Sequence, residues 1–221
     1  MRRVLFAAVA TGVSCVLLLA TGCGGSSTSH LRLLNAIPIQ SDLDMLIDSK
    51  NVASAVAYGA ASRYVSVSAG SRHMQIEPTG VPNPIVDQNT SFSSGSFSTV
   101  MESSSGPTVF TDSNATPSSG NISLRVINAS HNVGTADVYI VSSGTGIGTA
   151  SPTFAGVGFP SATGYQTLAA GSYQILFTFP GTTSVELSTN SLPFTSGQVR
   201  TVVVLDGQTG GVTTSVLSDL N

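Results

Sequence analysis

The chain contains an internal repeat, and this repeat constrains the fold more than any other feature. The stretch LRLLNAIPIQSDLDMLID, which begins at Leu31, returns at Leu124 as LRVINASHNVGTADVYIV. Aligned without a gap, the two stretches share leucine, arginine, asparagine, alanine, aspartate and isoleucine at matching places. The repeating unit is about 90 residues long, which is the size of a small domain. The repeat therefore predicts two copies of one domain.

Alternating apolar and polar residues predict that both units are built from strands. YVSVSAGSRHMQIEP, which starts at Tyr64, and YQTLAAGSYQILFTF, which starts at Tyr165, alternate around a glycine at the same place. We expect these glycines, Gly70 and Gly171, to lie in turns with positive φ. No apolar stripe with helical spacing persists for three turns. The pattern favours an all-β chain with roughly seven short strands per unit, arranged as two tandem β-sandwiches.

The unit boundaries follow from composition. TDSNATPSSGN is a polar stretch rich in Pro, Gly and Ser, so we expect the first sandwich at residues 30–116 and the second at 117–221. The second unit ends in VLSDLN, which is similar to the VFTDSN that leads into this linker.

The N-terminus is typical of a secretory signal. Arg2 and Arg3 precede the apolar run VLFAAVATGVSCVLLLA, and small residues stand before Cys23. The ATGC stretch resembles a bacterial lipoprotein signal, in which residues 1–22 are removed and Cys23 is acylated, for example with palmitate. Residues 23–29 then form a flexible tether. Ordinary cleavage that leaves a free thiol and a membrane-spanning helix are the alternatives.

Cysteine usage favours acylation of Cys23. Cys15 leaves with the signal, so Cys23 has no disulfide partner and no neighbouring metal ligand in the exported chain. Several acyl chains hold a protein firmly on a membrane. Glycine after Cys23 resembles the signal for outer-membrane sorting in bacteria with two membranes. We therefore expect an exported protein, lipid-anchored to the outer membrane or cell envelope.

Composition excludes a nucleic-acid partner and indicates a weakly charged surface. Lys and Arg number 8 against 11 Asp and Glu, so no basic patch is available to bind phosphates. Charged residues make up only 9% of the chain, whereas Ser, Thr and Gly are abundant. Such a hydroxyl-rich surface suits an exported β-protein.

Four motifs carry a resemblance to a known family. LRVINAS, ADVYI, YQTLAAGSY and GQVRTVVVLDG resemble the bacterial domain-of-unknown-function family numbered 4397, found in exported and lipid-anchored proteins. The resemblance covers both units and implies two tandem copies. It further implies immunoglobulin-like or transthyretin-like sandwiches outside the cytoplasm. It brings no catalytic residues.

Two repeated side chains invite a structural interpretation. Arg32 and Arg125 stand second in the opening strand of each unit, and we expect them to point outward and pair with Asp44 or Asp137 on a neighbouring strand. A ligand contact made twice is the alternative. Asp44 and Asp137 are also candidates for strand-edge carboxylates that bond to the loop after the first strand.

Other repeated side chains are expected to hold the fold together. We expect Asn35 and Asn128 to hold the turn that leaves the first strand of each unit. Tyr64 and Tyr165 are expected to be core rings with hydroxyls bonded to the backbone, as in the tyrosine corner of immunoglobulin sandwiches. A surface that stacks on carbohydrate is the alternative for the two tyrosines.

Candidate chemistry is sparse. Asp42, Asp44 and Asp48 can supply oxygen ligands to calcium, but the glycine and closing glutamate of an EF-hand are absent. The three histidines do not recur between units, and there is no GxSxG motif. We expect no catalytic residues, no metal site and no cofactor.

These features predict a non-catalytic structural or interaction module. It would bind an envelope protein or a glycan through loops at the ends of the sandwiches, with the membrane as a further partner through the lipid. The alternative is a calcium or carbohydrate binder that uses Asp42, Asp44 and Asp48 or the cleft between the domains.

Overall fold

The computed structural model describes residues 27–38 and 42–220. The predicted signal and Cys23 lie outside these residues. Every regular element in the described part of the chain is a strand. Within it, no helix is long and apolar enough to cross a membrane.

Residues 28–112 form the first half, in two sheets of four strands. One sheet has the order β4-β1-β7-β8 and the other β3-β2-β5-β6; β1 and β7 run parallel, and the remaining pairs are antiparallel. The strand β1 begins inside the stretch expected to be the tether. The strands are β1 (Thr28–Ala36), β2 (Leu43–Ile47), β3 (Lys50–Val56), β4 (Val65–Ser68), β5 (Gly70–Pro78), β6 (Val86–Phe92), β7 (Phe97–Ser103) and β8 (Gly106–Asp112).

Residues 121–220 form the second half, in two sheets of five strands. One sheet has the order β12-β9-β17-β18, with β13 also on β9; the other has the order β11-β10-β14-β15, with β16 on β14. The parallel pair recurs between β9 and β17. The strands are β9 (Asn121–Ala129), β10 (Ala136–Ser142), β11 (Phe154–Val157), β12 (Ser161–Ala162), β13 (Gln166–Ala169), β14 (Gly171–Thr178), β15 (Val185–Ser188), β16 (Leu192–Phe194), β17 (Val199–Asp206) and β18 (Val212–Leu220).

Each half has its own core between its two sheets. In the first half, Leu31 and Leu33 of β1 belong to one buried cluster with Met45 of β2. In the second half, Leu124 of β9 belongs to another with Val138 of β10. The prediction of an all-β chain with two sandwiches is confirmed.

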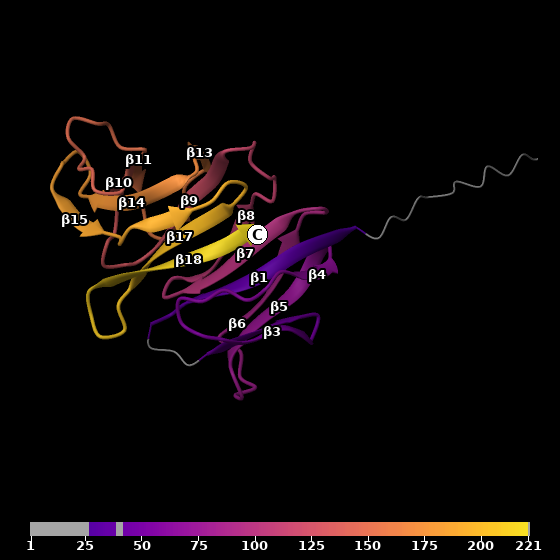
Figure 1. The fold of residues 1–221 in the computed structure, drawn as a ribbon. Coiled ribbons are helices and arrows are strands. Elements are labelled where there is room, and N and C mark those ends of the chain that lie inside the picture. The colour runs from indigo at the N-terminus through magenta and orange to yellow at the C-terminus, as the bar shows by residue number, and fades with distance from the viewer. Residues whose placement is uncertain (1–26, 39–41, 221) are drawn as a thin grey trace, which may run out of the picture.

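The two halves stack face to face, which makes four layers. Leu34 on the opposite face of β1 belongs to a third buried cluster, together with Ile127 of β9, Val203 of β17 and Leu217 of β18. Figure 1 shows β1 and β7 of the first half and β18 of the second half in the middle of the molecule, where the two halves meet. The two middle sheets are therefore buried on both faces. This explains why LRLLNA and TVVVLD read as nearly continuous apolar runs instead of alternating.

The two glycines that start matching strands differ in backbone conformation. Gly70 opens β5 with φ of 98°. Gly171 opens β14, but its φ is not positive, which corrects the prediction for it. The hairpin in the second half therefore turns without a left-handed residue at this place.

Alanine substitutions at these glycines should have unequal effects. At Gly70 an added Cβ meets nothing closer than 4.0 Å, so the cost of Gly70→Ala comes from the backbone and is expected to be roughly 1–2 kcal/mol of unfolding free energy. Gly171→Ala places a Cβ at an ordinary 3.7 Å from Tyr173 and should change stability by less than about 0.5 kcal/mol. Urea unfolding of both variants measures the difference, and equal losses would contradict this account.

Candidate functional site between the two halves

The side chain of Arg32 lies buried between the halves. It leaves β1 on the face that meets the second half and is 2% exposed. Its Nε donates to Thr99 Oγ1 at 2.8 Å, its Nη1 donates to the carbonyl of Ser218 at 2.9 Å, and its Nη2 donates to the carboxylate of Asp219. The predicted outward pairing with Asp44 is therefore wrong, because β1 is buried on both faces.

Arg125 makes the same set of contacts in the opposite direction. Its Nε donates to Thr201 Oγ1 at 2.8 Å, its Nη1 donates to the carbonyl of Thr111 at 3.0 Å, and its Nη2 donates to Asp112. The predicted pairing with Asp137 is wrong for the same reason. Each arginine thus binds the last strand of the other half, so the interface has approximate twofold symmetry.

The two sets of contacts join into one closed ring. Thr99 Oγ1 donates to Asp112 at 2.7 Å, and Thr201 Oγ1 donates to Asp219 at 2.6 Å. Each threonine hydroxyl therefore accepts a hydrogen bond from an arginine and donates one to an aspartate. We call this closed set the Arg–Asp ring; its members are Arg32, Thr99, Asp112, Arg125, Thr201 and Asp219.

Two tyrosines complete the ring from outside. Tyr64 Oη donates to Asp112 at 2.6 Å, and Tyr165 Oη donates to Asp219 at 2.9 Å. The guanidinium carbons of Arg32 and Arg125 each lie 4.7 Å from the centre of the tyrosine ring in their own half. The tyrosine hydroxyls thus bond to carboxylates, which corrects the prediction that they bond to the backbone.

Burial and neighbouring charges shift the pKa values of Arg32 and of the two tyrosines. Burial lowers the pKa of Arg32, but the charge of Asp219 and the nearby Tyr64 and Asp112 raise it by more, so the arginine stays charged. Burial raises the pKa of Tyr64 and Tyr165 well above the usual range, so both remain hydrogen-bond donors. Buried ions are tolerated only where their remaining sites are hydrogen-bonded, and the ring satisfies this condition.

The repeat contained a signal for the ring that the sequence predictions did not use. The arginines recur, and so do the two acids at the ends of the units, in VFTDSN and VLSDLN. The predicted partners, Asp44 and Asp137, belong to the opening repeat. The carboxylates that bind them come instead from Asp112 in β8 and Asp219 in β18.

The repeated asparagines hold the turn after the first strand of each half. Asn35 Oδ1 accepts from the backbone N–H of Ile37 at 3.1 Å, and Asn128 Oδ1 accepts from that of Ser130 at 3.1 Å. Their side-chain amides donate to carbonyls further along the chain, that of Asn35 to Val56 at 3.0 Å. These residues are structural in both halves.

Asp44 and Asp137 bind neighbouring segments instead of the arginines. Asp44 Oδ1 accepts from the N–H of Ala55 at 2.7 Å and from the hydroxyl of Thr79 at 2.6 Å. Asp137 accepts from the N–H groups of Gly156 and Gly181 at 2.7 and 2.8 Å. The expected bonds to the loop after the first strand are therefore replaced by bonds to two other segments in each half.

The three aspartates proposed for calcium do not form an ion site. Asp48 accepts from the N–H of His73 at 3.1 Å and lies 3.4 Å from Arg72, while Asp42 is exposed. In residues 27–38 and 42–220, no group of three or more His, Cys, Asp or Glu side chains is placed to hold a metal ion. The geometry gives the calcium hypothesis no site.

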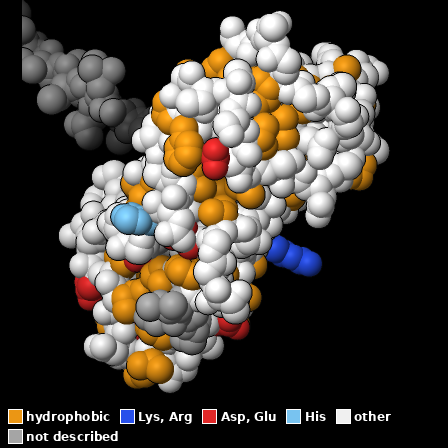
Figure 2. Space-filling model, turned by 90° about the vertical axis from the view of Figure 1, so that its left-hand side faces the viewer, with side chains coloured by type: hydrophobic (Ala, Val, Ile, Leu, Met, Phe, Trp, Pro, Cys, Tyr) orange, Lys and Arg blue, Asp and Glu red, His pale blue; other side chains and the backbone are white. Residues whose placement is uncertain are grey.

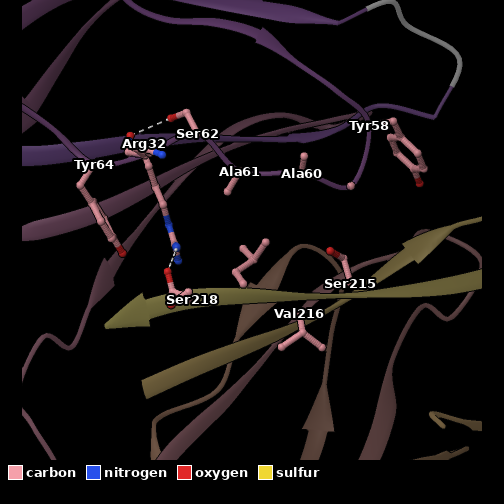
Figure 3. A pocket seen from close by; sticks show the side chains of 12 residues that line it. Arg32, Tyr58, Ala60, Ala61, Ser62, Tyr64, Ser215, Val216 and Ser218 are labelled. Carbon is pink, nitrogen blue, oxygen red and sulfur yellow. Dashed lines mark hydrogen bonds between the residues drawn. The ribbon is translucent and has the colours of Figure 1, made fainter. Parts of the chain in front are cut away.

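A groove of about 740 Å³ lies between the halves beside the ring. One wall is the segment 58–64, and the other is β18 from Ser215 to Ser218, with Arg32 reaching across to the Ser218 carbonyl (Figure 3). We call it the inter-half groove. A further hollow of about 600 Å³ adjoins it, because Tyr58, Gly59 and Ser215 line both. The volume of the inter-half groove lies in the range of small-ligand sites.

The molecular surface is weakly charged. In the view of Figure 2, acidic, basic and histidine side chains are isolated from one another, between apolar patches and a large area of other groups. Burial of the Arg–Asp ring removes four charged side chains from a chain that has few. Hydrogen bonding and shape, more than charge, are left to govern contacts at the surface.

No curated protein matches this chain. Among solved structures, the chain is similar to the Bacillus anthracis TIE protein, with 9% identity and a TM-score of 0.28; the match covers 81% of this chain and about a third, 34%, of that one. It is also similar to the family CBM26 module of Eubacterium rectale Amy13K, solved with maltoheptaose, at 10% identity and a TM-score of 0.28, over 86% of this chain and 96% of that one.

A third similar structure is that of a streptococcal virulence factor described as binding α-glucan. The identity is 12% and the TM-score 0.26, over 83% of this chain and 95% of that one. At the sequence level, the family described as domain of unknown function (DUF4397) matches residues 29–139, from β1 through the first half into β10. The chain therefore belongs to this family of domains of unknown function.

Proposed function

We propose that the chain is a non-catalytic interaction module of the bacterial cell envelope, in which two sandwiches act as one rigid body. The observation that carries this proposal is the Arg–Asp ring. Its six side chains are hydrogen-bonded to one another around a closed path, and a shared apolar cluster surrounds Leu34 and Ile127. A scaffold of this kind holds a binding surface in a fixed shape.

The chemistry of the site supports binding over catalysis. The charged groups of the ring are committed to one another, and their carboxylates accept hydrogen bonds from tyrosine and threonine as well. General acid–base catalysis needs a group within reach of a substrate proton. In the ring, both carboxylates have side chains that are 0% exposed. The ring is a structural device.

We further infer that the second half is a second copy of the family domain. It repeats the parallel strand pair, the arginine contacts and the tyrosine contacts of the first half. Two copies that bind each other through equivalent surfaces form a pseudo-dimer within one chain. Such pairing is typical of twofold interfaces, in which the same patch is used on both sides.

The envelope location rests on the N-terminal sequence. The signal and Cys23 support export and acylation, and β1 starts only a few residues after Cys23, at Thr28. The sandwiches would therefore lie close to the membrane surface. Their partners would be the membrane, through the lipid, and an envelope protein or glycan; a nucleic acid is disfavoured by the small number of basic residues.

Replacement of Cys23 tests this location. In cells grown with labelled palmitate, the wild-type chain is expected to carry label and to sediment with the membranes, whereas Cys23→Ser should carry none and stay in the soluble fraction. The loss is expected because serine lacks the thiol that carries the lipid, and the acyl chains are what holds the protein on the membrane. Cys15→Ser is the matched control and should behave like the wild type. An unlabelled, soluble wild-type chain would contradict the proposal.

A further inference from the structure

The two middle sheets are offset relative to each other, so none of the described strands lies on the outer side of β18 in its sheet. Arg32 in β1 binds Asp219, so β18 lies across from β1. The segment 58–64 extends the first-half sheet beyond β1, to which it is tied by bonds such as Ser62 N–H to the Leu33 carbonyl at 2.8 Å. This segment therefore overhangs the space next to the free edge of β18. The inter-half groove is this space (Figure 3).

The edge of β18 that faces this space pairs with no other strand in residues 27–38 and 42–220. The Ser218 carbonyl accepts from Arg32, so the backbone groups of Ser218 point away from β17. Backbone direction alternates along an antiparallel edge strand. The N–H and C=O groups of Val216 and Thr214 therefore point away from β17 as well. The residue Val216 is 41% exposed and lines the groove, so this stretch of edge is accessible.

The equivalent edge in the first half carries a proline, and that of β18 does not. Asp112 and Thr111 in β8 correspond to Asp219 and Ser218 in β18, because they make the same contacts with the opposite arginine. Counting back five residues from each aspartate shows that Pro107 in β8 is the equivalent of Thr214 in β18. Proline has no N–H, and it protects an edge strand from pairing. From Val212 to Ser218, β18 carries neither proline nor a charged residue.

The groove carries one uncompensated positive charge. Arg32 and Arg63 are the charged residues that line it, and Arg32 is neutralised by Asp219. Arg63 is exposed, and no carboxylate in the described part of the chain lies within ion-pair distance of it. An occupant with a carboxylate therefore complements the groove.

We propose that the inter-half groove binds an extended peptide with an acidic side chain, which adds to β18 as a further strand and places its carboxylate at Arg63. Strand addition takes its affinity from main-chain hydrogen bonds to an open edge and its specificity from alternate side chains. Ala60 and Ala61 line the opposite wall, so small side chains fit between that wall and the strand. This proposal names the partner of the interaction module proposed above and rests on that function.

A random dodecapeptide display library is the probe. We expect the exported chain, with Cys23 replaced by serine, to enrich peptides that contain Asp or Glu. Thr214→Pro gives β18 the residue that stands at the equivalent place in β8, and it should weaken these peptides about tenfold, since one hydrogen bond and close approach of the strand are lost. Arg63→Gln should weaken them by about threefold. Bound peptide should slow amide exchange at Val216 and Thr214.

Val109→Pro is the matched control, because it changes the exposed edge of β8 and should leave peptide binding unchanged. A melting temperature of Thr214→Pro close to that of the wild type separates lost binding from lost folding. Three results would overturn the proposal. The first is that the library yields no enriched peptide, and the second is that the peptides bind Thr214→Pro as tightly as the wild type. The third is that maltoheptaose binds in the groove with the same affinity in the wild type and in Thr214→Pro. Because binding is measured on unanchored protein, its failure is distinct from a failure of membrane anchoring.

Discussion

Asp219→Ala is expected to lower the free energy of unfolding by roughly 3–5 kcal/mol. The substitution leaves the guanidinium of Arg32 buried without its carboxylate, and it also removes an acceptor from Thr201 and Tyr165. Urea unfolding at neutral pH measures the loss. Asp112→Ala should cost about as much, because Asp112 holds the equivalent place in the Arg–Asp ring.

An exposed contact of an aspartate provides the control for this experiment. Asp87 lies 2.6 Å from His73, and its side chain is 53% exposed. Asp87→Ala should change the unfolding free energy far less than Asp219→Ala does, because solvent screens an exposed contact. Removing both partners of the buried pair, as in Arg32→Met with Asp219→Leu, should recover more than about half of the loss, because no unpaired charge remains. A cost of less than about 1 kcal/mol for Asp219→Ala would show that the ring does not hold the halves together.

Glu102→Val is expected to stabilise the protein at pH 8 by roughly 1–3 kcal/mol. Glu102 lies in β7 and is 4% exposed, and its Oε2 has no hydrogen-bond partner in the part of the chain that the structure describes. Burial raises the pKa of this carboxyl to about 7. The corresponding residue of the second half is Val204, which belongs to the buried core there. Valine therefore suits this position in the fold.

The same substitution should remove a pH dependence. The folded-state pKa of Glu102 is raised, so between pH 4.5 and 7 the unfolded chain loses the proton while the folded chain keeps it. The stability of the wild type should fall as pH rises through this window, relative to Glu102→Val. Urea unfolding at pH 5, 6, 7 and 8 measures both curves. Glu102→Gln, which keeps the shape without the charge, should follow the valine variant; parallel curves for all three proteins would contradict this account.

The strand pattern and the repeat made the architecture predictable. Alternation around Gly70, the polar linker and the recurrence of LRxxNA led to two sandwiches, because these are local properties of the chain. The stacking of the sandwiches was not predicted. Its signal was the departure from alternation in LRLLNA and LRVINA, where apolar residues on both faces report burial on both sides.

The Arg–Asp ring was missed for a reason that applies to repeats in general. When Arg32 and Arg125 recur together with Asp112 and Asp219, the sequence is equally compatible with pairing inside each unit and with exchange between units. Both arrangements use the same residues. Only the position of one sheet over the other decides between them, and this is a long-range property that no local pattern encodes. The inter-half groove depends on the same offset.

The ring is symmetric in space but not along the chain. Arg125 and Asp112 are 13 residues apart, whereas Arg32 and Asp219 are 187 apart. The entropic cost of closing a loop grows with the logarithm of the loop length. The Arg32–Asp219 contact, which closes the longer loop, therefore costs about 2 kcal/mol more chain entropy to form. We expect the two ion pairs to form in sequence during folding: the short one once β9 is in place, and the long one when the final strand docks. Until β18 docks, the guanidinium of Arg32 lacks its carboxylate partner, and the interface between the halves is incomplete on this side.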